Sequence, residues 1–308
     1  MIRAKRGGYL RPVEMFPGGD PDYRVSFPRL ASGLKIRAVE RGAPNAPPVV
    51  LLHGWGCSAY IFRDNLPAIA DAGFRAIAVD LKGHGLSDKP RERREYTVDA
   101  LLDHIREILD ALGIERARLV GHSMGGALTY HFAARFPERV ESIGLLSPVG
   151  LTGVPLMWLY RALTPAWLAP LVRFIRPRLA IKIGLKRVYG KRGSYTARDV
   201  DEYLAPFQFP DYAPAVRELL HAFDWEAAKH RSLAKVNARA FGAFGTLDHL
   251  MPRDKMAIYE RLVPGISITP IIDAGHVITE ETPQEVNAVL RALLGGQKGT
   301  SAILQMNE

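Results

Sequence analysis

The chain has 308 residues, of which 47% are hydrophobic and 24% are charged, so it can bury one large core or two small ones. This composition excludes disordered, collagen-like and coiled-coil proteins. The single cysteine, Cys57, excludes an intrachain disulfide and favours a reducing compartment, and we therefore expect a cytoplasmic protein. We expect no signal peptide, and the most apolar internal stretch, residues 162–172, is too short to cross a bilayer.

Short apolar runs that are typical of buried strands recur along the first half of the chain. Two weaker edge-strand candidates, residues 23–27 and 34–40, are followed by four stronger ones at residues 48–53, 74–80, 117–121 and 140–146. Continuous apolar runs of this length indicate a parallel sheet that is covered on both faces. Between two of these strands, residues 98–112 have helical spacing and end at Gly113. This alternation predicts an α/β protein with a doubly wound, mostly parallel sheet.

The strand pattern stops after Pro148 and returns at residues 238–245 and 267–272. A last helix is expected from Thr282, with Glu285 completing a capping box. The intervening residues have helical apolar spacing broken by prolines. We therefore predict a core formed by residues 1–148 and 237–308, and an inserted helical lid formed by residues 149–236. Because ligands bind at the carboxyl ends of strands in such sheets, the lid should lie over the site.

The positive charge of the chain is concentrated in the predicted lid. Residues 150–198 contain ten of the 41 bases and no acid, which leaves 31 bases to balance 32 acids elsewhere. Three interpretations remain open: a solvated face, attraction to anionic membrane surfaces or acidic substrates, and nucleic-acid binding. The last is disfavoured, since no recognition motif accompanies the charge.

A G-x-S-x-G pattern, residues 121–125, follows one predicted strand and opens a predicted helix. This context lifts a serine hydroxyl out of a sharp turn, and the helix N-terminus behind it favours an oxyanion. The sequence therefore predicts Ser123 as a nucleophile.

The base and the acid that a serine nucleophile needs follow the last two predicted strands. His276 and Asp248 come directly after those strands, in the chain order serine, acid, histidine. The carboxyl ends of parallel strands share one edge of a sheet, so we expect both side chains to lie beside Ser123. Asp273 is a competing acid, but it is too close in sequence to His276 for an easy approach, and we expect it to shape the loop.

Two backbone amides are expected to form the oxyanion hole. One is the N–H of Met124, and the other is the N–H of Trp55 in the loop after the strand at residues 48–53. The histidines at positions 53, 84 and 122 are expected to be structural. Cys57 is expected to be a small, partly buried thiol rather than a nucleophile.

Aromatic residues of the lid, together with Trp55, should line an apolar substrate pocket. The candidates are Trp55, Trp158, Trp167, Phe207 and Phe209. No ligand spacing indicates a metal, and no glycine-rich phosphate loop indicates a nucleotide cofactor. We expect neither, and we expect a small-molecule ester as the partner. The sequence does not indicate the oligomeric state.

Five motifs together resemble the α/β-hydrolase family. They are residues 53–56, 80–88, 121–126, 245–248 and 275–276, and the similarity extends from about residue 34 to residue 295. The segment 80–88 is similar to that of epoxide hydrolases and haloalkane dehalogenases. Those relatives carry an aspartate nucleophile where this chain has Ser123, and this departure argues against both activities.

The sequence therefore predicts a serine hydrolase of the carboxylesterase type, which cleaves apolar esters through an acyl-enzyme. The alternatives are a lipase that uses the lid as an interfacial flap, a lactone or carbon–carbon bond hydrolase with the same triad, and a non-catalytic small-molecule receptor.

Overall fold

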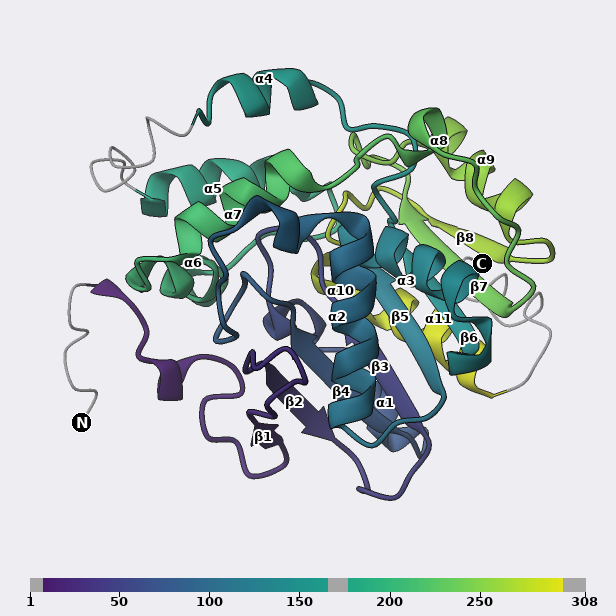
Figure 1. Ribbon diagram of the computed structural model, residues 1–308, viewed down its shortest axis with the longest axis horizontal. Coiled ribbons are helices and arrows are strands. Elements are labelled where there is room, and N and C mark those ends of the chain that lie inside the picture. The colour runs from purple at the N-terminus through teal and green to yellow at the C-terminus, as the bar shows by residue number, and fades with distance from the viewer. Residues whose placement is uncertain (1–7, 166–176, 296–308) are drawn as a thin grey trace.

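The computed structural model describes residues 8–165 and 177–295, which form an eight-stranded sheet with helices on both faces (Figure 1). The strand order is β1-β2-β4-β3-β5-β6-β7-β8, and all neighbours from β4 to β8 run parallel, whereas β1 and β2 are antiparallel. The strands are β1 Arg24–Ser26, β2 Arg37–Arg41, β3 Pro48–Leu52, β4 Arg75–Asp80, β5 Ala117–His122, β6 Val140–Leu146, β7 Arg239–Gly245 and β8 Ser267–Ile271. The predicted doubly wound, mostly parallel sheet is confirmed.

Both faces of the sheet are buried, and successive residues of a strand enter different cores. In β3, Val50 and Leu52 pack in one hydrophobic cluster, whereas Val49 and Leu51 pack in the other. The first cluster includes α2 (Val98–Ala111), α3 (Met124–Arg135) and α9 (Arg253–Leu262). The second includes α1 (Leu66–Asp71), α10 (Ile278–Glu281) and α11 (Pro283–Leu294). Burial on both sides explains why these strands are apolar without alternation.

The last helix begins where the sequence predicts, at Pro283, but the expected capping box is wrong. Thr282 makes no side-chain cap: its backbone, with φ −137° and ψ 57°, lies outside the extended region that N-cap residues adopt, and its hydroxyl donates a hydrogen bond to the carbonyl of Ile278. The preceding short helix α10, which the sequence pattern did not indicate, supplies that carbonyl.

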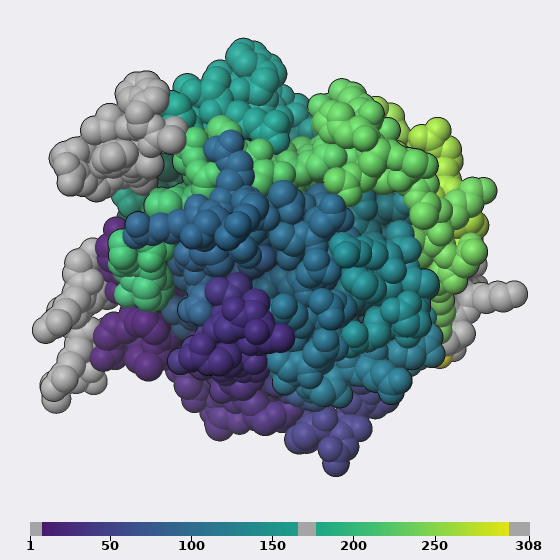
Figure 2. Space-filling view, in the orientation of Figure 1, coloured from purple at the N-terminus to yellow at the C-terminus, as the bar shows by residue number. Residues whose placement is uncertain are grey.

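Residues 149–236 leave the sheet after β6 and return at β7. The helices of this segment are α4 Met157–Ala162, α5 Pro177–Val188, α6 Ala197–Leu204, α7 Tyr212–Ala222 and α8 Ala227–His230. They lie together along one edge of the sheet, and their teal and green surface covers the upper side of the molecule in Figure 2. We call this segment the lid; its division from the core at residues 148 and 237 stays a prediction. Within the described ranges, no helix is both long enough and apolar enough to cross a membrane.

A buried network of charges ties the lid to the core. Arg63, which follows the 3₁₀ helix at Ala59–Phe62, forms ion pairs with Glu280 of α10 (2.6 Å) and with Asp199 of α6 (3.0 Å). The hydroxyls of Tyr189 and Tyr203 donate hydrogen bonds to Glu280 at 3.0 and 3.1 Å. Buried charges are tolerated where they are paired and hydrogen-bonded, so this network fixes where the lid sits.

Several histidines are buried in the core and are held neutral. Burial lowers the pKa of each of them, to about 3 for His122 and to about 4 for His131. The affected residues are His53, His84, His104, His122 and His131. Three of them, at positions 53, 84 and 104, accept a backbone N–H at Nε2, which only an imidazole without a proton on that nitrogen can do.

We therefore predict that the protein loses stability as the pH falls from about 6.5 toward about 4. In the unfolded chain these histidines regain a pKa near 6.5 and bind protons that the native state excludes, so acid favours unfolding. Each one contributes up to about 1.4 kcal/mol per pH unit to the slope. Urea unfolding at several pH values measures this slope, and His131→Gln should reduce it by about one proton. An unchanged slope in the variant would contradict the prediction.

Candidate active site

Ser123 occupies a sharp turn between β5 and α3. Its backbone has φ 56° and ψ −123°, a conformation that a residue with a side chain adopts only when its surroundings enforce it. Here the surroundings are backbone atoms that pack closely against Gly121 and Gly125. A Cβ on Gly121 would lie 2.1 Å from the carbonyl oxygen of Gly125, and a Cβ on Gly125 would lie 2.0 Å from that of Leu52. Only glycine fits at either position, so the turn that presents the serine depends on both.

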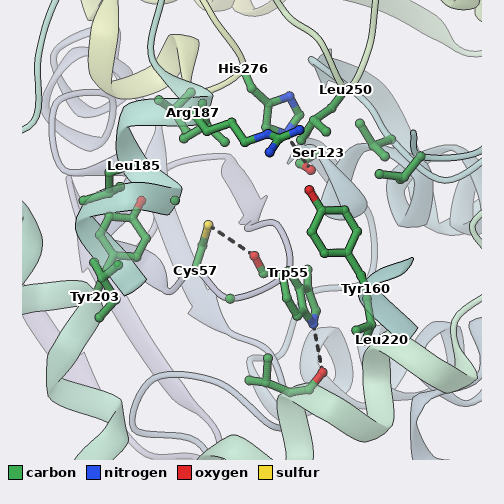
Figure 3. A pocket seen from close by; sticks show the side chains of 18 of the residues that line it. Trp55, Cys57, Ser123, Tyr160, Leu185, Arg187, Tyr203, Leu220, Leu250 and His276 are labelled. Atoms are coloured by element: carbon green, nitrogen blue, oxygen red, sulfur yellow. Dashed lines mark hydrogen bonds between the residues drawn. The ribbon is translucent and has the colours of Figure 1, made fainter. Parts of the chain in front are cut away.

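The structure brings Ser123, His276 and Asp248 into one hydrogen-bonded line. The Oγ of Ser123 lies 2.9 Å from Nε2 of His276, and Nδ1 of the same ring lies 2.8 Å from Oδ2 of Asp248. Figure 3 shows His276 directly beside Ser123. All three side chains are buried, and they come from the carboxyl ends of β5, β7 and β8. This is the geometry in which a histidine can take a proton from a serine while a carboxylate orients its ring.

The environment of Asp248 keeps its carboxylate charged. Burial tends to raise its pKa, but attraction and a hydrogen bond from His276, with hydrogen bonds from the amides of Met251 and Leu250, hold the pKa below its usual value. The two amides bind Oδ1, which leaves Oδ2 for the imidazole. The carboxylate can therefore stabilise an imidazolium at neutral pH.

The amides predicted for the oxyanion hole flank the serine. Met124 is the first residue of α3, and the loop that carries Trp55 passes directly over Ser123, since a Cβ on Gly54 would lie 2.9 Å from the serine Cβ. Among the described residues, no group accepts a hydrogen bond from the N–H of Trp55 or of Met124. Free donors beside the nucleophile are what an oxyanion requires.

The serine opens into a mostly apolar cavity of about 550 Å³ between the core and the lid. Trp55 and Phe207 line it, as the sequence predicts. The expectation for Trp158 and Phe209 is wrong for this cavity: Trp158 is 70% exposed on α4, and the ring of Phe209 packs against the ammonium group of Lys89. Trp167 lies outside the described residues.

The cavity also contains residues that sequence reasoning did not select. They include Tyr160 of α4, Leu185 and Arg187 of α5, Tyr203 of α6 and Tyr212 of α7. The helical periodicity of the lid was visible in the sequence, but which face of each helix meets the core was not. For Arg187 the signal was the stretch of ten bases, which did not separate one base from another.

The lid holds two loops of the site in place. The indole N–H of Trp55 donates a hydrogen bond to the carbonyl of Val216 in α7 (2.9 Å). The amide of His276 donates to the carbonyl of Val188 at the end of α5 (2.7 Å). Glu281, which the sequence analysis also missed, accepts hydrogen bonds from the amides of Gly275 and Gly190, so it joins the histidine loop to the same lid segment.

The remaining candidates have structural roles. His122 donates its Nε2–H to the carbonyl of His276 at 2.9 Å, while His53 and His84 bind loop amides as described above. Cys57 is half-buried at the cavity wall, and burial raises its pKa to about 12, so it is a thiol and not a thiolate at neutral pH. Asp273 adopts φ 60°, and its backbone carbonyl accepts a hydrogen bond from the amide of Lys191, as expected of a loop-forming residue. In the described part of the chain, no three histidine, cysteine or acidic residues gather as a metal site would require.

Comparison with known proteins identifies the family. A family model described as "alpha/beta hydrolase fold" matches residues 47–173. The dihydrolipoyllysine-residue acetyltransferase component of the acetoin cleaving system of Pseudomonas putida is 30% identical over 264 residues, which are 85% of this chain and 67% of that protein. Bifunctional epoxide hydrolase 2 of Sus scrofa is 39% identical over 115 residues, which are 37% of this chain and 20% of that protein.

A solved structure, that of Cfl2 from Burkholderia cenocepacia, is 28% identical with a TM-score of 0.77, and the match covers 88% of this chain and 97% of that one. This protein belongs to the α/β-hydrolase superfamily, as its sequence motifs indicated. The family and its relatives support a hydrolase activity.

The contact of Gly54 with the nucleophile generates a prediction. Gly54→Ala should slow the reaction of Ser123 with a fluorophosphonate probe by roughly 100-fold, because the new methyl group displaces the serine or the oxyanion loop by a fraction of an ångström to an ångström. Labelling is followed by mass spectrometry of the peptide that contains Ser123, and circular dichroism checks that the fold is kept. Wild-type labelling rates in a folded variant would show that the loop does not constrain the serine.

Proposed function

We propose that this protein is a serine carboxylesterase. The observation that carries the proposal is the line Ser123–His276–Asp248 at the wall of an apolar cavity, with two free amides beside the serine. Each part corresponds to one requirement of acyl transfer: a nucleophile, a base, an orienting carboxylate and an oxyanion site.

In the first half of the proposed reaction, Oγ of Ser123 attacks the ester carbonyl and Nε2 of His276 takes the hydroxyl proton. The carbonyl oxygen becomes an oxyanion, which the amides of Trp55 and Met124 stabilise. Collapse of this intermediate breaks the bond to the alcohol oxygen, and the imidazolium returns the proton to the leaving alcohol. The product is an ester of Ser123 with the acyl group.

In the second half, His276 takes a proton from water, and the resulting hydroxide attacks the acyl carbonyl. The tetrahedral intermediate again places its charge on the two amides. It collapses with release of the carboxylic acid, and the proton returns to Oγ of Ser123. Asp248 stays ionised throughout and stabilises the imidazolium at both stages.

The identity of the nucleophile supports ester rather than epoxide chemistry. The epoxide hydrolases and dehalogenases that the sequence resembles use an aspartate, whose alkyl-enzyme ester is hydrolysed at the aspartate carbonyl. A serine would form an ether with an opened epoxide, and water does not hydrolyse an ether under these conditions. A serine therefore suits a substrate whose carbonyl accepts and then releases it.

The test is hydrolysis of 4-nitrophenyl esters with acyl chains of increasing length, by the wild type and by Ser123→Ala. We expect a burst of nitrophenolate followed by steady turnover in the wild type, and a decrease in kcat of at least about 10⁴-fold in the variant. The chain-length optimum then measures the cavity. The integrity of the variant is checked by its melting temperature.

Turnover that survives the substitution would remove Ser123 from its role and contradict the proposal. If neither protein turns over any ester, a lactone and a carbon–carbon substrate panel comes next. A ligand that raises the melting temperature without being turned over would instead indicate the receptor alternative.

A second candidate function, a lipase acting at anionic lipid surfaces, is favoured by the outer face of α5. Leu179 and Ile183 are 56% and 61% exposed, and they alternate along the helix with exposed Lys182 and Lys186. None of these four side chains lines the cavity. A face that mixes apolar and basic residues is typical of helices that lie on membrane surfaces.

If the lipase function holds, vesicles that contain phosphatidylglycerol should bind the protein, and they should raise its activity toward long-chain esters. The double variant Leu179→Ser and Ile183→Ser should lose both effects and keep its activity toward a soluble short-chain ester. Sedimentation with vesicles measures binding, and neutral phosphatidylcholine vesicles are the control. Equal behaviour of wild type and variant would exclude this face from lipid binding.

A further inference from the structure

One permanently charged side chain lines the otherwise apolar cavity. It is Arg187, which α5 contributes together with Ala180, Gly184 and Leu185. Ala180, Gly184 and Arg187 are four and three residues apart, so they share one face of the helix. Arg187 therefore belongs to the cavity face of α5, whereas Lys186, the next residue, belongs to the outer face.

Arg187 has no acidic partner among the described residues. Three other bases of the lid are paired with acids: Arg178 with Asp201, Arg192 with Glu285 and Arg198 with Glu202. For Arg187 no carboxylate lies within ion-pair distance in the described ranges, and no aspartate or glutamate lines the cavity. The Arg187 side chain is exposed to solvent and also lines the cavity, so its guanidinium is available to an anionic group of a ligand.

The cavity that Arg187 lines is the one into which the serine opens. In the view of Figure 3, the side chain of Arg187 extends toward His276 and Ser123, and all three residues line this cavity. One ligand in the cavity can therefore contact both Arg187 and Ser123.

The chemistry of the cation limits what the group can be. A guanidinium matches the two oxygens of a carboxylate with parallel hydrogen bonds. A single cation balances one negative charge, whereas a phosphate monoester carries nearly two at neutral pH. A carboxylate is therefore the better match.

We propose that the physiological substrate is an ester that also carries a free carboxylate, and that Arg187 binds this carboxylate while the ester lies at Ser123. This inference rests on the proposed esterase function and names its substrate class. Arg187 is a specificity-determining residue in this proposal, and the apolar remainder of the cavity receives the rest of the molecule.

The test compares two chromogenic esters that differ in one charge. They are mono-4-nitrophenyl glutarate, which has a free carboxylate, and its methyl ester, 4-nitrophenyl methyl glutarate. We expect the wild type to have the higher kcat/KM with the free acid. Arg187→Gln should reduce that preference 10- to 100-fold, mainly through KM, and should change the rate with the methyl ester less than twofold. Arg187→Lys should keep part of the preference, because it keeps the positive charge and loses the paired N–H donors of the guanidinium.

Lys186→Gln is the matched control, since it removes the same charge from the neighbouring residue on the outer face of α5. It should leave the preference unchanged. If this control reduces the preference as much as Arg187→Gln does, the effect comes from net charge and the proposal is overturned.

Two further results would overturn the proposal: a wild type without preference for the free acid, and a preference that survives in Arg187→Gln. Both are distinct from failure of the esterase function itself. That failure shows as turnover of the methyl ester by Ser123→Ala, or as no turnover of either ester by the wild type.

Discussion

The turn at Ser123 is the constraint on which the site depends. Its strained backbone persists because β3, β5 and α3 approach so closely that glycine is required at positions 121 and 125. The same close approach puts the oxyanion loop against the serine at Gly54. Three elements that are separate in sequence thus fix the position of one hydroxyl. A hydroxyl held in this way needs little rearrangement to take part in the acyl transfer proposed above.

The lid does more than cover the cavity, because it also makes hydrogen bonds to two loops of the site. The loop of the base is bound to the lid through the His276–Val188 hydrogen bond and through Glu281, and the oxyanion loop is bound through the Trp55–Val216 hydrogen bond. The Arg63–Glu280 ion pair anchors the same region from the core side. A displacement of the lid would therefore break hydrogen bonds to both loops at once.

The sequence predicted the sheet and the approach of Ser123, His276 and Asp248 because both follow from short local patterns. Buried strands are apolar, the serine turn needs its glycines, and parallel strands place Asp248 and His276 at the same edge. The cavity wall was predicted less well. Trp158 and Phe209 were expected there and Arg187 was not. Which face of a lid helix meets the core depends on tertiary contacts that no local pattern specifies. The Thr282 cap failed for a similar reason: the helix α10 before it is too short to recognise in the sequence, and Thr282, at its end, lacks the extended backbone of an N-cap residue.

The excess positive charge of the lid is distributed over several environments in the folded chain. Part of this charge is paired with acids outside the basic stretch, as at Arg178, Arg192 and Arg198. Arg161 instead donates hydrogen bonds to the carbonyls of Leu220 and Phe223. What remains on α5 is split by helical geometry between two faces. Lys182, Lys186 and Arg187 are all exposed, but only Arg187 also lines the apolar cavity. A charge on the outer face is screened by salt, whereas a charge at the cavity wall can pair directly with a group of the ligand. This difference is the reason why Arg187, and not its neighbour Lys186, is proposed to select the substrate.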